Sequence, residues 1–532
     1  MAIVDTPDDA SIILSKREGC FLPYSQWLLQ KGVWGYERVV RFRFFEAGGH
    51  VRMAKIFREY RKAQGRLVTL RAKLARNPNV DLLVGSPNIW ATLSPRSFIP
   101  KLQGLGIQRM LWSSATSAAN IEFMNNNVSD VLSSRYDIYQ DAMDRNSFPN
   151  LSYTHKDWTT EAFPDDVVYD SSGDWVRGWG VLGKDGETWY YCGAICDRQA
   201  LKYARNRTEE ELRTKHYRCR FLDTTTASGW RECYHKDHPM TRSESREWRM
   251  RLLDYFYSEH NLVVGSETGH EAAVPYLHYF EGMMSLGPYR VKDAGRRMYE
   301  VVYDVPEQIT RFQLGHAYRL PLWELVYHDC VVAYWYWGDY NNKLPPVWDK
   351  RDLFNALYGV PPMYLINQTG WDTYRDRFVQ SYNNTVPIAR AVGYSEMLKH
   401  EFLTEDRDVQ QTTFLLEPGR VKKVIVNFGT EAPYSHPGTG ATVQPMSYYT
   451  YEDEEEEDVP APPASSESAS GSSSGSLSKS SSGDPTSSSS SSGITPESGS
   501  KASESKHTDS AVRPAVGSSL CICLLLALAL LF

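Results

Sequence analysis

The chain has 532 residues, of which 41% are hydrophobic and 13% aromatic, enough to bury one large core and additional modules. Its formal net charge is −7, and the acidic run Glu452–Asp458 alone carries that charge, so the remainder is close to neutral. No basic stripe is present, which argues against a nucleic-acid partner. The cysteines form neither a CxxC pair nor a complete zinc motif, so we expect isolated buried thiols, with one or two disulfides if the chain is secreted.

Residues 1–50 contain aromatic and β-branched stretches, such as ERVVRFRFFEAGG at 37–49. They predict the remnant of an N-terminal β-rich domain whose beginning is missing. Met1–Leu14 has neither a basic segment nor a long apolar segment, so it does not resemble a signal peptide. Ala54–Gln64 has the spacing of a helix.

Between residues 51 and 400, short apolar runs alternate with helix-compatible segments such as Arg246–Glu259. The predicted strands lie at 80–85, 107–114, 131–139, 217–223, 261–267, 329–338 and 361–368. This alternation indicates an α/β fold with a parallel sheet. We predict a (β/α)8 TIM-type catalytic barrel, because no G-x-G-x-x-G follows a strand and the length suits a barrel better than a doubly wound sheet.

The C-terminal part divides into three predicted segments. Residues 401–447 form a small β-module, with two strands around a Pro-Gly turn at 412–429, and residues 448–508 form an acidic and Ser/Gly-rich disordered stalk. Residues 509–532 combine small residues, a spacer and an apolar run, as in a GPI-attachment signal or an apolar membrane tail. The lipid would be attached at Asp509 or Ser510, which predicts a protein on the extracellular face of the plasma membrane.

Two predicted strands end in a carboxylate, Asp223 and Glu267. The C-terminal ends of barrel strands meet at one mouth, so these acids can lie together. Burial would raise the pKa of Glu267, as a general acid needs, while Arg220 or Arg135 would keep Asp223 ionised as a nucleophile. The alternative is a pair of buried salt bridges to these arginines.

Other side chains near the predicted strand ends are candidates for sugar binding. The candidate hydroxyl binders are Arg135, Asp137, His328 and Asp329, and the candidate stacking platforms are Trp112, Trp335 and Trp337. His328 and Asp329 could equally form a satisfied core pair, and the aromatic residues could fill a bulky core. The loop CYHKDHP places His235, Asp237 and His238 close together; we favour a polar loop at the rim of the mouth over a metal site.

Six stretches gain meaning from their order: MAKIFREYRKAQG at 53–65, SSRYDIYQD at 133–141, FLDTTTA at 221–227, VVGSETGHEAAVPY at 263–276, RLPLWELVYHDCVVAYWYWGD at 319–339 and VIVNFG at 424–429. Together they resemble the glycoside hydrolases of family 129 and their relatives in family 101. The resemblance implies a catalytic barrel between β-rich modules and retaining hydrolysis of α-linked N-acetylgalactosamine on glycoconjugates. In that pattern the nucleophile falls on Asp223 and the acid/base on Glu267. The family is also associated with a bound calcium ion, whose ligands this sequence does not place.

Two alternatives to this enzyme stay open at the level of sequence. A cell-surface lectin or adhesin could keep the barrel pocket and bind glycans without cleaving them. A related α-glycosidase could act on galactose or glucose, because the sequence does not reveal a pocket for an N-acetyl group. The two-carboxylate mechanism itself requires no cofactor.

Overall fold

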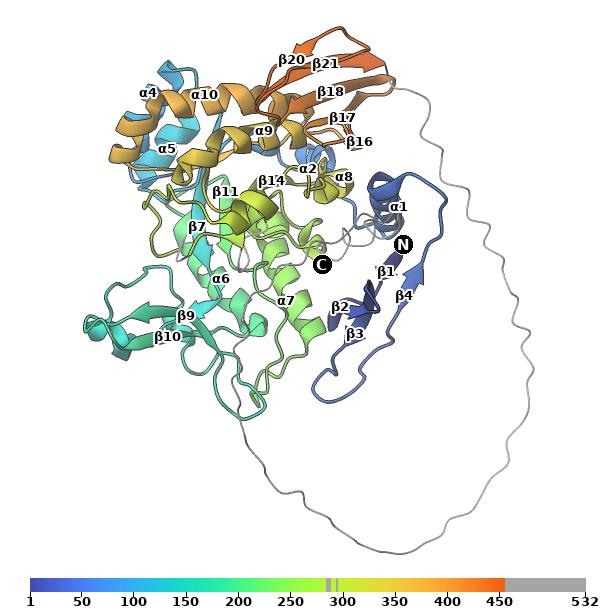
Figure 1. Ribbon diagram of the computed structural model, residues 1–532. Coiled ribbons are helices and arrows are strands. Elements are labelled where there is room, and N and C mark those ends of the chain that lie inside the picture. The colour runs from blue at the N-terminus through green and yellow to red at the C-terminus, as the bar shows by residue number, and fades with distance from the viewer. Residues whose placement is uncertain (284–288, 293–294, 455–532) are drawn as a thin grey trace, which may run out of the picture. The chain divides into compact units, whose positions relative to one another are not determined.

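The computed structural model describes residues 1–283, 289–292 and 295–454 of the chain. Its central feature is a parallel sheet that curves into a nearly closed barrel (Figure 1). The barrel strands are β5 (Asn88–Ala91), β6 (Met110–Trp112), β7 (Val131–Ile138), β11 (Cys219–Asp223), β12 (Val263–Glu267), β13 (Tyr279–Met283), β14 (Val332–Trp335) and β15 (Met363–Ile366). From β5 to β14 each barrel strand is paired with the next barrel strand in chain order, and β15 pairs with β5. The predicted α/β barrel is confirmed.

The barrel ladder is interrupted between β14 and β15, where asparagine side chains take the place of a strand. The backbone N–H groups of Met363 and Leu365 donate to the amide oxygens of Asn341 (3.2 Å) and Asn342 (2.9 Å). The Asn342 amide donates in return to the carbonyl of Leu365 (2.8 Å). The free edge of β15 therefore has hydrogen-bond partners, as a buried edge requires.

Successive residues of each barrel strand alternate between the interior and the surrounding helices. An interior core joins side chains from across the barrel, among them Leu111, Leu132, Phe221 and Tyr334. Their sequence neighbours pack outward, as Leu222 does against the helical layer. This alternation decides which strand-end residues can face a substrate in the mouth.

Helices surround the barrel on its outer side (Figure 1). They are α1 (Gly49–Ala63), α2 (Leu70–Arg76), α3 (Val80–Leu83), α4 (Pro95–Gly104), α5 (Ala118–Asn126), α6 (Asp197–Leu212), α7 (Arg242–Asp254), α8 (Leu322–Tyr327), α9 (Trp348–Tyr358) and α10 (Gln368–Val392). The predicted helices at 54–64 and 246–259 correspond to α1 and to α7, which continues as a π-helical turn over Tyr255–Glu259.

Two of the barrel strands were not predicted, and one predicted strand is wrong. Residues 80–85 begin with helix α3, because a short apolar run fits a buried helix as well as a strand. The first strand is instead β5, which begins after Pro87. The strand β13 reads YFEGM, and its buried glutamate and a glycine at φ +69° hide it from a search for apolar runs.

Smaller sheets flank the barrel. In the N-terminal segment β1 (Ala2–Val4) pairs with β4 (Val40–Phe42), and β2 (Ala10–Arg17) pairs with β3 (Cys20–Trp27). Between β7 and α6 lies a three-stranded sheet of β8 (Asp141–Ala142), β10 (Trp189–Ala194) and β9 (Arg177–Leu182).

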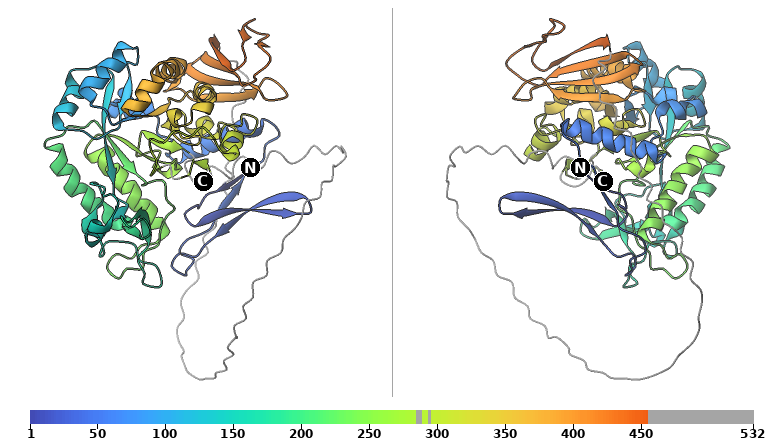
Figure 2. Two further views of the ribbon diagram at one scale, coloured as in Figure 1. Left: turned by 60° about the vertical axis from the view of Figure 1, so that its left-hand side comes forward. Right: turned by 90° about the vertical axis from the view of Figure 1, so that its right-hand side faces the viewer.

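The C-terminal module is a four-stranded antiparallel sheet that packs on α9 and α10 (Figure 2). Its strands are β16 (Met397–Phe402), β17 (Val409–Glu417), β18 (Arg420–Asn427) and β21 (Ser447–Glu454), with β19 (Tyr434–Ser435) and β20 (Thr442–Val443) beside them. The expected turn at 418–419 joins β17 to β18. The start of the predicted stalk is in fact strand β21, where Glu452 and Asp453 form ion pairs with Arg420 and Lys423 (both 3.0 Å). These cross-strand charges explain how an acidic segment joins a sheet.

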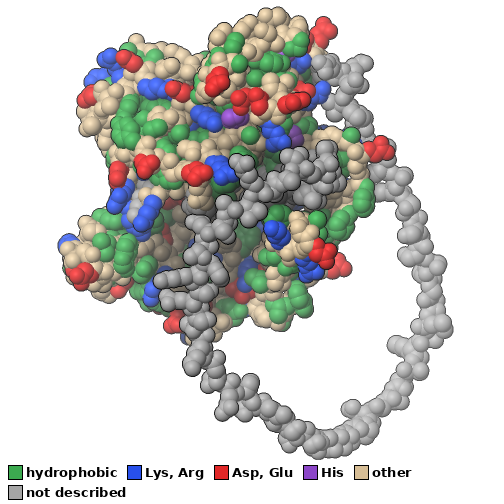
Figure 3. Space-filling view, viewed as in Figure 1, with side chains coloured by type: hydrophobic (Ala, Val, Ile, Leu, Met, Phe, Trp, Pro, Cys, Tyr) green, Lys and Arg blue, Asp and Glu red, His purple; other side chains and the backbone are tan. Residues whose placement is uncertain are grey.

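The rest of the predicted stalk, from residue 455, and the segment with Asp509 and Ser510 lie outside the described residues. The domain boundaries at 50, 400 and 508 stay predictions. Within the described part of the chain, no helix is both long and apolar enough to cross a membrane. On the face seen in Figure 3, lysines and arginines lie among aspartates and glutamates, without a basic stripe.

Candidate active site

Three carboxylates lie side by side on neighbouring barrel strands, two at the ends of their strands and the third in the middle of β13. Asp223 ends β11 and Glu267 ends β12, and the preceding residues of the two strands, Leu222 and Ser266, are register partners. Glu267 is in turn the register partner of Glu281 on β13. All three side chains stand at positions of their strands that face the barrel interior, and neighbouring strands lie about 4.8 Å apart. The row therefore lines the inside of the barrel mouth.

The carboxyl groups of Asp223 and Glu267 lie within hydrogen-bond reach of each other. Burial raises the pKa of Glu267 well above its usual range, and the neighbouring Asp223 charge raises it further. Burial also raises the pKa of Asp223, although hydrogen bonds from Tyr136 (2.6 Å) and from Glu267 favour its ionised form. A hydrogen bond between two carboxyl groups requires a proton on one of them, and these environments place it on Glu267. The pair thus consists of a protonated Glu267 and an ionised Asp223.

The cation beside this pair is Arg290, not Arg135 or Arg220. Its guanidinium lies 3.5 Å from Glu267 Oε1 and 3.5 Å from Asp339 Oδ1. It also lies 3.9 Å from the centre of the Tyr336 ring, which faces it. Its charge lowers the pKa of both members of the pair and so limits the effect of burial.

Glu281 is a site residue that the sequence prediction missed, because its strand was not recognised. Its carboxylate accepts hydrogen bonds from Asn88 Nδ2 (2.7 Å), Trp90 Nε1 (2.9 Å) and the Tyr340 hydroxyl (3.0 Å). Burial raises its pKa to about 7. Since three donors already engage both of its oxygens, Glu281 is less free than Glu267 to exchange a proton with a substrate.

The candidate hydroxyl binders Arg135 and Asp137 lie on the outer side of the barrel. Arg135 pairs with Asp157 (2.6 Å) and Glu211 (2.9 Å), and Asp137 pairs with Arg220 (2.8 Å). Because side chains alternate along β7, Arg135 and Asp137 point to the face opposite Tyr136, which faces Asp223. These charges form a buried network between β7, β11 and α6. The ion pairs of both arginines are therefore made with acids other than Asp223 and Glu267, on the side of β7 that faces away from the mouth.

The three candidate tryptophans also point away from the mouth. Trp112 is fully buried against Phe98 in the outer core. Trp335 and Trp337 stack on each other 5.6 Å apart, and Trp335 Nε1 donates to Glu324 (2.8 Å). The bulky-core interpretation is correct for these residues. The aromatic rings that do surround the carboxylates belong to Trp90, Tyr136, Tyr336 and Tyr340.

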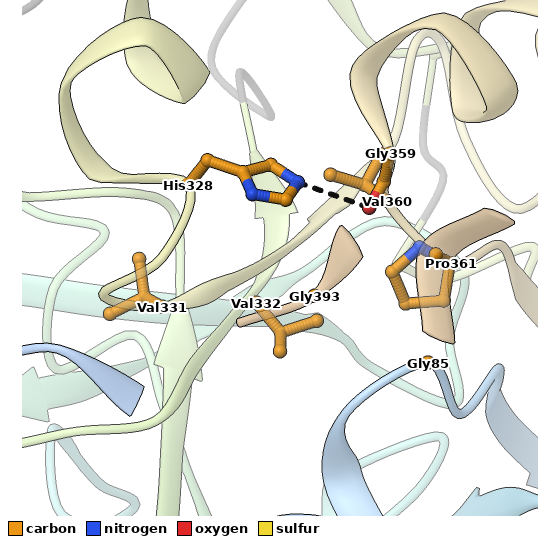
Figure 4. A pocket seen from close by; sticks show the side chains of 9 residues that line it. Gly85, His328, Val331, Val332, Gly359, Val360, Pro361 and Gly393 are labelled. Atoms are coloured by element: carbon orange, nitrogen blue, oxygen red, sulfur yellow. Dashed lines mark hydrogen bonds between the residues drawn. The ribbon is translucent and has the colours of Figure 1, made fainter. Parts of the chain in front are cut away.

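His328 and Asp329 lie before the first residue of β14, at the opposite end of the barrel from the carboxylates. Both ring nitrogens of His328 face backbone carbonyls, those of Ser395 (2.7 Å) and Gly359 (3.1 Å; Figure 4). Asp329 forms two 2.8 Å hydrogen bonds with Arg58. These residues form the satisfied core pair. The small pocket beside them is lined by Gly85, His328, Val331, Val332, Gly359, Val360, Pro361, Ala389 and Gly393, and this lining contains no carboxylate.

Among the residues that the structure describes, the clusters of acidic, histidine and cysteine side chains include none that suits the calcium ion implied by the family resemblance. Calcium prefers several oxygen ligands, mostly carboxylates and carbonyls. Among residues 1–283, 289–292 and 295–454, the one group of three or more acidic, histidine or cysteine side chains close enough to share an ion is Cys196, Cys233 and His238. Its sulfur and nitrogen donors do not suit calcium.

A parallel barrel with paired carboxylates at its mouth is the arrangement of a glycoside hydrolase. The model of the glycosyl hydrolases related to family GH101, family GH129, matches residues 102–295 and 285–413, more than half of the chain. The chain therefore belongs to glycoside hydrolase family 129 and is a glycosidase.

Solved structures of similar fold include α-N-acetylgalactosaminidase NagBb from Bifidobacterium bifidum in complex with GalNAc. It shares 21% identity with a TM-score of 0.61, covering 80% of this chain and 70% of that one. The Gal-NHAc-DNJ complex of the same enzyme gives 21% identity and a TM-score of 0.59 over 80% and 70% of the two chains. No curated protein gives a significant match.

Proposed function

We propose that this chain is a retaining α-glycosidase that uses Asp223 as nucleophile and Glu267 as acid/base. The observation that carries the proposal is the direct contact of these two carboxyl groups, at one level of adjacent strands inside the mouth. Retaining enzymes hold their carboxyl groups about 5–5.5 Å apart, while inverting enzymes leave about 6.5–9.5 Å for a water molecule. Carboxyl groups within hydrogen-bond reach leave no room for that water molecule, which favours the retaining class.

The reaction proceeds in two displacements. A carboxylate oxygen of Asp223 attacks the anomeric carbon, the bond to the leaving oxygen breaks, and Glu267 gives its proton to that oxygen. Glu267 then takes a proton from water as the water oxygen attacks the same carbon, which releases Asp223 and the sugar. The proton ends on Glu267 and the negative charge on Asp223, so the starting state returns without a cofactor.

The surrounding side chains support these roles. The Tyr136 hydroxyl stabilises the charge on Asp223, which favours attack over protonation. Arg290 lies beside Glu267, where its charge limits the rise in the pKa of Glu267. Glu281 orders Trp90 and Asn88 in the mouth through its hydrogen bonds.

We propose α-linked N-acetylgalactosamine, or a closely related α-glycoside, as the sugar that is cleaved. Family membership and the fold shared with NagBb, an α-N-acetylgalactosaminidase, support this choice. The natural substrate would then be a glycoconjugate with such a residue at a cleavable linkage.

The test is hydrolysis by the purified full chain of the p-nitrophenyl α-glycosides of N-acetylgalactosamine, galactose and glucose. We expect turnover of the first, its loss in Asp223→Asn, and a loss of about 10²–10⁴-fold in Glu267→Gln. Glu324→Gln is the matched control, since Glu324 is a buried acid outside the barrel interior with a pKa raised by burial to about 7. NMR of the first-formed product should show the α-anomer.

Two results would contradict the proposal. A first-formed β-anomer would show inversion and exclude a covalent role for Asp223. Glycan binding without turnover of any of the glycosides, unchanged in both variants, would identify a lectin or adhesin on the same barrel.

We also propose that the enzyme is held at the extracellular face of the plasma membrane by a lipid attached at Asp509 or Ser510. The support is the sequence alone, a trio of small residues, a spacer and the apolar run Leu520–Phe532. Phosphatidylinositol-specific phospholipase C should release the protein from cells that express it. Retention of the protein, with the peptide 520–532 still present by mass spectrometry, would contradict this anchor.

A further inference from the structure

A second group of reactive side chains lies outside the barrel mouth. Cys196 immediately precedes helix α6, and Cys233 and His238 belong to the loop between β11 and α7. All three are buried, and one ligand atom from each lies within 4.8 Å of the others. His238 Nδ1 is 3.4 Å from the sulfur of Cys233. Two sulfurs and a ring nitrogen thus converge on one point.

A backbone carbonyl determines which ring nitrogen of a neutral His238 carries the hydrogen. Nε2 lies 2.9 Å from the backbone carbonyl of Asp165, which can only accept, so Nε2 carries the hydrogen. In the neutral ring Nδ1 then has a lone pair, and this nitrogen faces the sulfur of Cys233. Metal-bound histidines show this same arrangement, with the second nitrogen donating to a carbonyl. The ring of His235 stacks on His238 at 4.0 Å and holds its orientation.

A backbone bridge closes the loop that carries Cys233 and His238. Cys233 and Met240 form a two-way antiparallel bridge, with N–H···O distances of 2.8 and 3.0 Å, which closes the loop between them. Around the donors lies an apolar cluster that includes Val168 and Met240. Met240 Sδ is 3.9 Å from Cys196 Sγ, so a thioether borders the group.

The distances and charges match Zn²⁺. With bonds of about 2.3 Å to sulfur and about 2.0–2.1 Å to nitrogen, tetrahedral zinc separates the two donors by about 3.5 Å. The observed separation between Cys233 Sγ and His238 Nδ1 is 3.4 Å. Two thiolates and a neutral imidazole carry two negative charges, so a divalent ion makes the buried site neutral, whereas Cu⁺ would leave a net charge there.

We propose that Cys196, Cys233 and His238 bind one structural zinc ion. Binding replaces the two thiol protons, which pass to solvent, and ties the loop that follows Asp223 to the N-terminus of α6. A disulfide between the two cysteines is the competing arrangement, and it would leave the buried Nδ1 of His238 without a donor or ion.

The test is the metal content of the full chain, purified without a histidine tag and measured by inductively coupled plasma mass spectrometry. We expect about one zinc per chain, bound by these three side chains. Cys233→Ser and His238→Ala should each lose most of this zinc. Cys192→Ser should keep it, because Cys192 is an equally buried thiol in a separate cluster.

A spectroscopic measurement on the wild-type chain keeps the test valid if a variant fails to fold. After exchange of the metal for Co²⁺, thiolate ligation should give intense absorption in the near ultraviolet. A chain with negligible metal and a Cys196–Cys233 disulfide in its non-reduced peptide map would overturn the proposal. Zinc that stays at the wild-type level in both ligand variants would overturn it as well. Neither result depends on glycosidase activity.

Discussion

Replacing Tyr136 by phenylalanine removes one hydrogen bond from the proposed nucleophile and leaves the ring in place. The Tyr136 hydroxyl lies 2.6 Å from Asp223 Oδ2, on the strand next to β11. A hydrogen bond to a charged group is worth about 1.5–3 kcal/mol. One pKa unit corresponds to about 1.36 kcal/mol, so loss of this bond should raise the pKa of Asp223 by about 1–2 units.

The sign of the effect on activity follows from the role of Asp223. The nucleophile must be ionised, so activity falls on the acid side as the carboxyl pair gains its second proton. In Tyr136→Phe this acid limb should move to higher pH by about 1–2 units. The assay is the pH profile of kcat/KM on p-nitrophenyl α-N-acetylgalactosaminide.

Tyr139→Phe is the matched control for this profile. Its hydroxyl also donates to an aspartate, Asp137 at 2.8 Å, but on the outer side of the barrel. The pH profile of kcat/KM for this control should have its acid and basic limbs at the same pH as wild type. An acid limb that stays in place in Tyr136→Phe, or moves to lower pH, would refute the assignment of Asp223 as the ionised member of the pair.

Two further predictions concern stability. Burial acts to raise the pKa of Glu211, but Arg220 and Arg135 outweigh it and lower the pKa to about 2. The ionised carboxylate therefore contributes its full share to folding stability above about pH 4.5, and this stabilisation is lost as the pH falls toward 2. Denaturant unfolding should show Glu211→Gln less stable than wild type by about 2 kcal/mol at pH 7, allowing for solvent screening, and the difference should shrink by pH 3; a constant difference, or an equal loss in the exposed Glu210→Gln, would contradict this. A methyl group at Gly265 would overlap the Tyr279 ring inside the barrel, so Gly265→Ala should lose about 1–3 kcal/mol in thermal unfolding, and an unchanged Tm would refute that overlap.

The class of fold could be predicted from sequence because most barrel strands contain a short apolar stretch, and these stretches alternate with helix-compatible segments. The predicted strands at 131–139 and 217–223 are β7 and β11, which keep apolar residues such as Leu132 and Phe221 in the barrel interior. The strand β13 escaped detection because a buried glutamate takes the place of an apolar residue there. Glu281 was therefore missed together with its strand, whereas Asp223 and Glu267 stand at the ends of strands that were recognised.

The role of a strand-end residue depends on which way it points, and a single sequence does not show that. Asp223 and Asp137 both lie at the C-terminal ends of neighbouring strands, yet one faces the mouth and the other faces α6. The difference is one step of the alternation along the strand, and it is set by the closure of the barrel. For the same reason Arg290 and not Arg220 stands beside the acids.

The sequence by itself determined the barrel, the family resemblance and the two acids at the ends of β11 and β12. Local composition carries these features, because strands need apolar residues and a charge at a strand end is conspicuous. Only the tertiary structure decided which groups surround the acids, which tryptophans are core, and that Cys196 lies beside Cys233 and His238. Such contacts join residues distant along the chain, and their distances depend on the packing of the whole barrel.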